Sequence, residues 1–302
     1  MQQKVLILGA SGRFGRNAAL AFETAGWHVR RFRRGHETLD DAARDTDVIV
    51  NGFNPAYPNW ARDVPALTRD VIRVARRYAA TVIIPGNVYV FGQHTPAPWG
   101  VQTPHQAQNP LGRVRIDMEQ AYADAGVKTI ILRAGDFIDT EPSGNWFDKV
   151  MIKNLHKGVF TYPGRPDIPH AWAYLPDLAR ACVALAEQRT RMPVFNDIPF
   201  AGYTLSGAEM RAALEAVLAR PVRLKSMSYA PLFLARPFWR MAAPLLEMRY
   251  LWNTPHWLEN RVFNDLVPAF QETPLEQALA NAVRHQSRQG EINPDEPVAA
   301  RA

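Results

Sequence analysis

Three glycines near the start of the chain, Gly9, Gly12 and Gly15, have a spacing that suits phosphate chemistry. They follow a short apolar run at 5–8 and precede apolar residues at helical spacing from 18 to 22. In such a strand–turn–helix the first glycine lets the chain leave the strand, the second admits a pyrophosphate, and the third lets the helix pack closely. The first-turn N–H groups and the helix dipole then face the phosphates. The stretch predicts a dinucleotide-binding turn; a glycine-rich turn without a ligand is the alternative.

The end of the second predicted strand, at 27–32, bears on which dinucleotide would bind. An acidic residue near this position bonds the adenosine ribose 2′-hydroxyl and favours NAD. This chain has Arg33 and Arg34 there instead, and Arg13 in the glycine turn could reach the same phosphate. Because a guanidinium binds a phosphate through two hydrogen bonds, the pattern favours NADP over NAD. A solvated basic turn is the alternative for Arg33 and Arg34.

The GxxGxxG spacing resembles the short-chain dehydrogenase/reductase superfamily, and the layout from Lys4 to about Ala280 is similar to its extended and atypical branches, the NAD(P)-dependent epimerase/dehydratase-like proteins. The resemblance implies an α/β fold, a doubly wound parallel sheet (Rossmann) with a smaller C-terminal substrate-binding lobe. It also implies a sugar nucleotide or another small carbonyl or hydroxyl compound as substrate. Dimers are usual in the superfamily, so a homodimer is the expected assembly.

The family's Tyr-x-x-x-Lys motif aligns with residues 109–119. In that motif the tyrosine gives a proton to a carbonyl oxygen, and the lysine lowers the tyrosine's pKa and holds the nicotinamide ribose. Here Leu111 stands at the tyrosine and Arg115 at the lysine. Leucine cannot transfer a proton, whereas Arg115 can hold ribose hydroxyls and add positive potential. The proton must come from elsewhere, and the candidates are Tyr89, Asp136, His170 and Tyr174.

The family's serine or threonine after the next strand is also absent. Gly86 and Asn87 stand in its place, and Tyr89 supplies a phenol two residues further on. Each candidate has a structural alternative: Tyr89 as a packed aromatic, Asp136 as an Asx-turn residue, and His170 as a structural histidine.

Three further predicted strands, at 47–51, 81–84 and 127–132, end at the same edge of the sheet as the glycine turn. Ligands bind at the carboxyl ends of parallel strands, so the loop after each strand is expected to line the cofactor site. The turn at 133–136 corresponds to a family turn that lies next to the nicotinamide. The expected cofactor-binding residues are Gly9, Ser11, Gly12, Arg13, Phe14, Gly15, Arg33, Arg34, Gly52, Phe53, Pro85, Gly86, Asn87, Arg115, Arg133, Ala134 and Gly135.

The composition of the 302 residues is that of an ordinary globular protein, with 47% hydrophobic and 21% charged residues and a net charge of +6. Despite the charge, no helix-turn-helix, zinc-ligand spacing or basic aromatic ribbon favours nucleic acid or a metal. The longest apolar stretches are shorter than the roughly 20 residues that a membrane span needs. The aromatic segment at 229–252 is interrupted by charges and is expected to be buried or to form a lid, with membrane contact as the minor alternative. The single Cys182 excludes an internal disulfide, and a cytoplasmic location is expected.

The chain is expected to divide into a Rossmann domain at 1–140, completed by segments around 171–200, a substrate-binding or lid lobe at 141–285, and a disordered tail at 286–302. The first functional hypothesis is an NADP-dependent oxidoreductase or epimerase/dehydratase-like enzyme. The second is a catalytically silent NADPH-binding sensor, because the motif residues are replaced. The expected partner is a small-molecule substrate, with no nucleic acid and no membrane.

Overall fold

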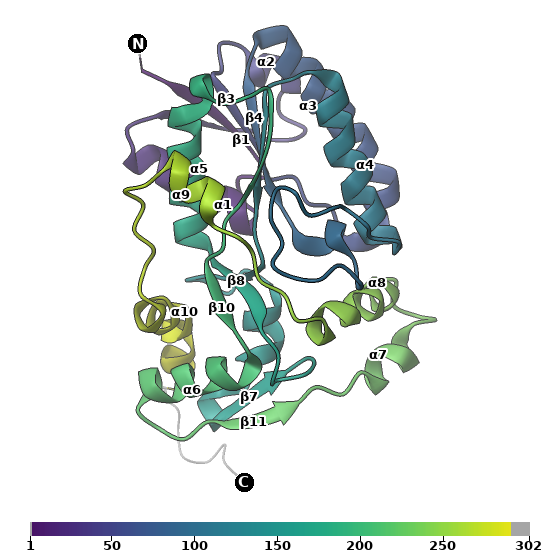
Figure 1. Cartoon of the computed structure of the whole chain (residues 1–302), viewed down its shortest axis with the longest axis vertical. Helices are drawn as coiled ribbons and strands as arrows, with labels where there is room; N and C mark the ends of the chain where they lie inside the picture. The colour runs from purple at the N-terminus through teal and green to yellow at the C-terminus, as the bar shows by residue number, and fades with distance from the viewer. Residues whose placement is uncertain (1, 291–302) are drawn as a thin grey trace.

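The computed structural model describes residues 2–290 (Figure 1). A six-stranded parallel sheet forms its larger part, with the strand order β2-β1-β3-β4-β5-β9. Its strands are β1 (Lys4–Leu8), β2 (His28–Arg31), β3 (Val48–Asn51), β4 (Thr81–Gly86), β5 (Thr129–Arg133) and β9 (Phe195–Pro199). The strand order reverses between β1 and β3, which places a crevice at their carboxyl ends. The predicted doubly wound parallel sheet is confirmed.

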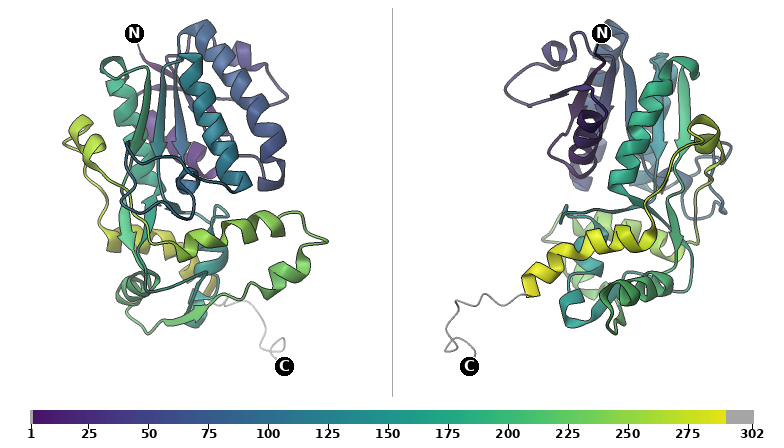
Figure 2. Two further views of the ribbon diagram at one scale, coloured as in Figure 1. Left: turned by 45° about the vertical axis from the view of Figure 1, so that its right-hand side comes forward. Right: turned by 90° about the vertical axis from the view of Figure 1, so that its left-hand side faces the viewer.

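Helices cover both faces of this sheet (Figure 2). They are α1 (Arg13–Thr24), α2 (Leu39–Ala43), α3 (Trp60–Tyr78), α4 (Pro110–Ala125) and α5 (Leu175–Gln188). Alternate residues of β1 show how the sheet is covered: Val5 and Ile7 pack in the core beneath α1 and α5, whereas Leu6 and Leu8 pack in the core beneath α3 and α4. A parallel sheet buried on both faces has strands that read as continuous apolar runs, which explains the pattern at 5–8.

A smaller C-terminal lobe lies below the carboxyl ends of the strands (Figure 1). It contains a three-stranded sheet in the order β10-β8-β6 and a two-stranded sheet of β11 and β7. Its strands and longer helices are β6 (Asp136–Ile138), β7 (Val159–Tyr162), β8 (His170–Tyr174), β10 (Tyr203–Leu205), β11 (Arg223–Ser226), α6 (Gly207–Leu218) and α10 (Leu275–Gly290). Phe160, Trp172 and Trp252 belong to its separate core, so the predicted lobe has a hydrophobic centre of its own.

Short helices complete the chain. They are α7 (Ala230–Ala235), α8 (Ala242–Glu247) and α9 (Arg261–Leu266), with single turns at Tyr57–Asn59, Val88–Phe91, Phe147–Met151, Leu155–Lys157, Arg189–Arg191 and Met248–Asn253. Within residues 2–290, no helix is both long and apolar enough to cross a bilayer. The predicted tail at 286–302 falls partly on α10, which continues to Gly290, and its remaining residues lie outside the described part of the chain.

Candidate functional site

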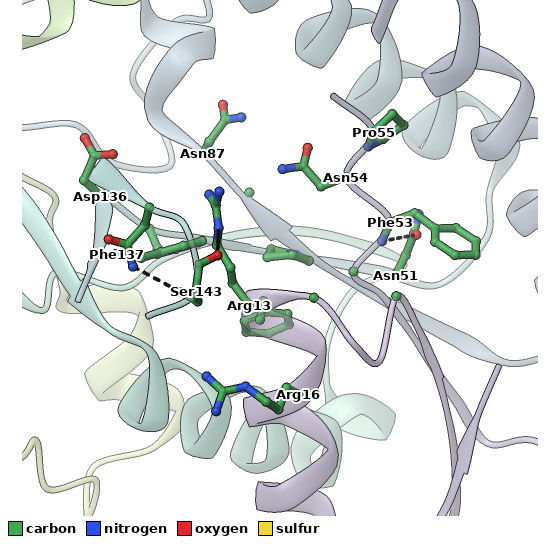
Figure 3. Close-up of a pocket in the computed structure, with 18 of the residues that line it drawn as sticks. Arg13, Arg16, Asn51, Phe53, Asn54, Pro55, Asn87, Asp136, Phe137 and Ser143 are labelled. Carbon is green, nitrogen blue, oxygen red and sulfur yellow. Dashed lines mark hydrogen bonds between the residues drawn. The ribbon is translucent and has the colours of Figure 1, made fainter. Parts of the chain in front are cut away.

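A cavity of about 940 Å³ lies at the carboxyl edge of the main sheet, where β1, β3, β4 and β5 end (Figure 3). Most of the expected cofactor-binding residues line it, namely Gly9, Ser11, Gly12, Arg13, Phe14, Arg34, Gly52, Phe53, Pro85, Gly86, Asn87, Arg115, Ala134 and Gly135. Two of the proton-donor candidates, Tyr89 and Asp136, line it as well. Residues that follow four strands, far apart in the sequence, thus line one continuous cavity, as expected from their positions at the strand ends.

The glycine turn is built by close backbone packing. Gly9 has a φ of +71°, and a Cβ atom there would lie 2.7 Å from the carbonyl oxygen of Gly52 in the neighbouring turn. A Cβ atom on Gly15 would lie 2.2 Å from the carbonyl oxygen of Gly9. Gly15 does not line the cavity, because its role is to let α1 pack against the end of β1.

The N-terminus of α1 faces this cavity without a cap. Gly12 is its N-cap residue, and within the described residues no side chain caps it and no acidic residue occupies its first turn. The N-terminus of α6, by contrast, is closed by a capping box of Ser206 and Glu209. Unpaired first-turn N–H groups at the positive end of a helix dipole form a site for an anion. A pyrophosphate fits this end of the cavity.

The two arginines after β2 occupy different positions. Arg34 lines the cavity, and its guanidinium carbon lies 4.7 Å from the centroid of the Phe53 ring. Phe53 in turn packs edge-to-face on Phe32, with ring centroids 6.0 Å apart. Arg33 is exposed and does not line the cavity, so the prediction that both arginines face the cofactor is wrong for Arg33.

Arg13 spans the cavity from the glycine turn to a covering loop at 141–146. Its Nε donates to the carbonyl oxygen of Ser143 at 2.9 Å, and its Nη2 donates to that of Gly144 at 2.6 Å. Figure 3 shows the Arg13 side chain directed toward Ser143. The sequence suggested that Arg13 reaches the same phosphate as Arg34. In the structure, the Arg13 guanidinium is instead hydrogen-bonded to the covering loop.

Arg115 is a buried cation in the cavity wall. Its Nη2 donates to Asn54 Oδ1 at 2.9 Å, and its guanidinium carbon lies 4.0 Å from the Trp60 ring centroid. Its Nε has no hydrogen-bond partner, and among residues 2–290 no carboxylate forms an ion pair with it. Burial lowers the pKa of Arg115, and the charge of the nearby Glu119 opposes this shift. A buried guanidinium with an unpaired donor suits an anionic or hydroxyl-rich ligand.

Tyr89 stands on the same wall. Its hydroxyl lies 2.7 Å from the hydroxyl of Tyr57, and its ring stacks on Trp60 at 6.2 Å between centroids. Burial, followed by the nearby Tyr57 and Asp136, raises the pKa of Tyr89 well above its usual value. The Tyr89 phenol therefore keeps its proton at neutral pH. Asn87 Oδ1 accepts the Tyr89 N–H at 3.0 Å and caps the short helical turn that carries the tyrosine.

Asp136 and His170 form a pair at the end of β5. His170 Nε2 lies 2.8 Å from Asp136 Oδ2, and the imidazole stacks on Trp252 with ring centroids 4.4 Å apart. Asp136 lines the cavity, but His170 is buried behind it and does not. Contrary to the expectation that it contacts a substrate, His170 does not line this cavity, and the side chain that connects it to the lining is Asp136.

Tyr174, another proton-donor candidate, and Leu111, at the motif's tyrosine position, both lie outside the main cavity. Tyr174 does not line the cavity, and its hydroxyl accepts a hydrogen bond from Asn281 Nδ2 at 3.2 Å. The side chain of Leu111 lines a second, apolar cavity of about 600 Å³, and its N–H donates to Glu247 Oε1 at 2.7 Å. Neither residue is placed to transfer a proton in the main cavity.

Arg133 is the largest correction among the expected cofactor contacts. Its side chain is fully buried beneath the cavity, and its Nη2 donates to Glu119 Oε2 at 2.7 Å and to Asp197 Oδ2 at 2.6 Å. His105 completes the cluster at 3.6 and 3.5 Å from these carboxylates. Arg133 Nη1 also donates to the carbonyl oxygen of Asn87 at 2.6 Å. Arg133 therefore supports the loop after β4 from below.

Sequence reasoning missed three parts of the cavity wall. They are Asn54, Tyr57 and the covering loop at 141–146, none of which was expected to line the site. The loop supplies Glu141, Pro142, Ser143, Asn145 and Trp146 to the lining. The available signal was the position of Asn54 and Tyr57 just after β3, at the edge where ligands bind.

Several solved structures share this fold. A nucleoside-diphosphate-sugar epimerase from Pseudomonas aeruginosa superposes with a TM-score of 0.72 at 16% identity, covering 96% of this chain and 99% of that one. UDP-glucuronic acid 4-epimerase from Bacillus cereus, in complex with UDP-glucuronic acid and NAD, superposes with a TM-score of 0.72 at 14% identity, covering 95% and 100%. MoeE5, in complex with UDP-glucose and NAD, gives 0.72 at 13% identity, covering 95% and 99%.

No protein-family model matches the chain, and no curated protein matches its sequence. The fold expected from the resemblance to epimerase/dehydratase-like proteins is confirmed. Over nearly its whole length, the chain has the same Rossmann-type fold as these nucleotide-sugar epimerases.

Proposed function

We propose that the chain binds a nicotinamide dinucleotide and acts as an oxidoreductase or epimerase/dehydratase-like enzyme on a sugar nucleotide or another small carbonyl or hydroxyl compound. The observation that carries this proposal is one cavity that joins the uncapped N-terminus of α1 to the buried Arg115. These are two separate positive sites at the switch point of a Rossmann sheet. Neighbours with this fold hold NAD and UDP-sugars.

In this proposal, each part of the cofactor binds a different part of the cavity wall. The first turn of α1 would hold the pyrophosphate, and Phe53 with Arg34 would hold the adenosine. Ala134 and Gly135 would lie beside the nicotinamide, with Arg115 on its ribose. When bound, the dinucleotide supplies hydride transfer.

Tyr89 is the proposed proton donor. Its phenol lines the cavity, and its ring stacks on the Trp60 ring over which the Arg115 guanidinium lies. The phenol would donate its proton to a substrate oxygen as negative charge develops there, and the Arg115 guanidinium would stabilise the resulting phenolate. Tyr89 and Arg115 would thus supply the phenol and the cation that the family's motif carries on one helix.

The cofactor assignment is tested by fluorescence titration with NADPH and NADH. Wild type should prefer NADPH, and Arg34→Ala should lose most of that preference, about 10–100-fold in Kd, because a charged hydrogen bond to the phosphate contributes about 1.5–3 kcal/mol. Arg33→Ala is the matched control, since Arg33 does not line the cavity, and should keep the preference. Equal loss in both variants would contradict the assignment, and no binding of either nucleotide would overturn the proposal.

The proton-donor assignment is tested with Tyr89→Phe. Turnover with UDP-glucose or UDP-glucuronic acid should fall by about 100-fold or more, as expected when a general acid is removed. NADPH affinity should remain within about twofold, because Phe keeps the packing on Trp60. His170→Ala is expected to lower turnover less, since it acts through Asp136. Full activity of Tyr89→Phe would remove Tyr89 from the mechanism.

The second candidate function is a catalytically silent NADPH-binding sensor. The observation that favours it is the replacement of the family's catalytic tyrosine by Leu111. The Leu111 side chain is buried and lines the second cavity. A sensor would show Arg34-dependent NADPH binding but no hydride transfer with these UDP-sugars or with a panel of small carbonyl compounds. The same titration and turnover assays therefore separate the two functions.

A further inference from the structure

The hairpin of α7 and α8 exposes large apolar side chains. Phe233 and Leu234 on α7 are 54% and 77% exposed, and Phe238 and Trp239 in the following turn are 92% and 47% exposed. No residue of α7 is buried. The hairpin projects from the lobe at the right of Figure 1, and the left view of Figure 2 shows the same projection. The expectation that this segment is buried or covers the main cavity is therefore wrong for its outer part.

Basic residues surround the exposed tip. Arg236 and Arg240 flank Phe238 and Trp239, and across residues 2–290 neither arginine pairs with a carboxylate within 4.0 Å. From residue 219 to 252 the chain contains six basic residues and one acidic residue, Glu247. Glu247 is turned toward the body, where its Oε1 accepts hydrogen bonds from Asn109 Nδ2 at 2.8 Å and from the N–H of Leu111. The outer surface of the hairpin is thus aromatic and positively charged.

We propose that this hairpin docks on the surface of an anionic phospholipid bilayer. Phe238 and Trp239 would enter the interfacial layer, where aromatic side chains are favoured, and Arg236 and Arg240 would contact lipid phosphates. This mode of attachment requires no spanning helix. These four residues do not line the main cavity, although Arg236 lines the second cavity beside Leu111.

The charge pattern favours a bilayer over a second copy of the chain. A two-fold contact through the tip would place the same patch of both copies face to face. The arginines of one copy would then lie opposite those of the other, and like charges across an interface are unfavourable. An anionic lipid surface complements both the arginines and the aromatic side chains.

The test is co-sedimentation of the purified full chain with vesicles of phosphatidylcholine alone or of phosphatidylcholine mixed with phosphatidylglycerol. Wild type should sediment with the mixed vesicles and much less with phosphatidylcholine alone. Arg236→Gln/Arg240→Gln and Phe238→Ser/Trp239→Ser should each weaken partitioning by about tenfold or more. Leu20→Ser is the matched control, because Leu20 is a comparably exposed apolar residue on α1, and it should bind as wild type does.

Unchanged NADPH affinity in all variants would show that they remain folded. Absence of wild-type sedimentation with the mixed vesicles would overturn the proposal. Binding that is equal with both vesicle types and insensitive to the arginine variant would overturn it as well. Concentration-dependent dimerisation that Phe238→Ser/Trp239→Ser abolishes, without vesicle binding, would instead assign the patch to a second copy.

Discussion

Arg115 and Arg133 are both buried near the carboxyl ends of the strands, but their charges are handled differently. Arg133 donates to two carboxylates, of Glu119 and Asp197, and to a backbone carbonyl. Arg115 faces the cavity, donates to Asn54 and leaves its Nε without a partner. A buried charge is costly unless it is paired. We infer that Arg133 serves the folded state, and we propose that Arg115 serves ligand binding.

The largest expected effect is on stability at Arg133. Arg133→Met leaves the buried Glu119 and the half-buried Asp197 with only His105 beside them, and breaking a buried ion pair typically costs about 3–5 kcal/mol in the free energy of unfolding. Urea denaturation measures the loss. Arg113→Met is the control, because Arg113 is an exposed arginine on α4, and it should change the stability by less than about 0.5 kcal/mol. A loss below about 1 kcal/mol at Arg133 would mean that the cluster contributes little to folding.

The same contrast should appear in the pH dependence of stability. Burial would raise the pKa of Asp197, but the Arg133 charge and the His105 and Arg133 hydrogen bonds outweigh it and lower the pKa. A carboxyl with a lowered pKa stabilises the fold above its unfolded pKa of about 3.9, and this stability is lost as the pH falls through the folded pKa.

The destabilisation by Arg133→Met should therefore shrink between about pH 5 and pH 3, because protonated carboxyls no longer need the arginine. The reduction is expected because the contribution of Asp197 to stability disappears as the pH falls through its lowered pKa. Urea denaturation of both proteins across this range measures it. A destabilisation that is independent of pH would show that Asp197 and Glu119 are not the partners that matter.

A much smaller effect on stability is expected at Arg115 than at Arg133. Arg115→Met keeps the packing on Trp60 and removes a charge without a carboxylate partner, so the free energy of unfolding should change by less than about 1 kcal/mol. Binding should respond instead, with the NADPH Kd rising by about tenfold or more as a charged hydrogen bond is lost. Arg115→Lys should recover part of the affinity. Loss of stability with unchanged NADPH affinity would make Arg115 a structural residue like Arg133.

Much of the cavity could be predicted because its parts follow short rules along the chain. The glycine turn is a contiguous motif, and Gly52, Phe53, Asn87 and Ala134 follow apolar runs that end at one edge of a parallel sheet. These arguments need only local spacing and the direction of the strands. They could not separate Arg33 from Arg34, because neighbouring residues of an irregular turn point in different directions and only one of them reaches the cavity.

The failed assignments depend on partners far away in sequence. The Arg133 side chain lies beneath the cavity because it is hydrogen-bonded to Asp197, which is 64 residues further along the chain. His170 lies behind Asp136, where it stacks on Trp252. Arg13 donates a hydrogen bond to the covering loop at Ser143, which is 130 residues away in the sequence. No spacing rule along the chain connects such pairs.

The sequence by itself therefore determined the sheet, its switch point and the glycine turn, because periodicity and glycine spacing are local properties that the backbone converts directly into structure. Only the tertiary structure decided which charged side chains face the cavity and which are neutralised beneath it. The physical reason is that the cost of burying a charge depends on partners that only folding brings together.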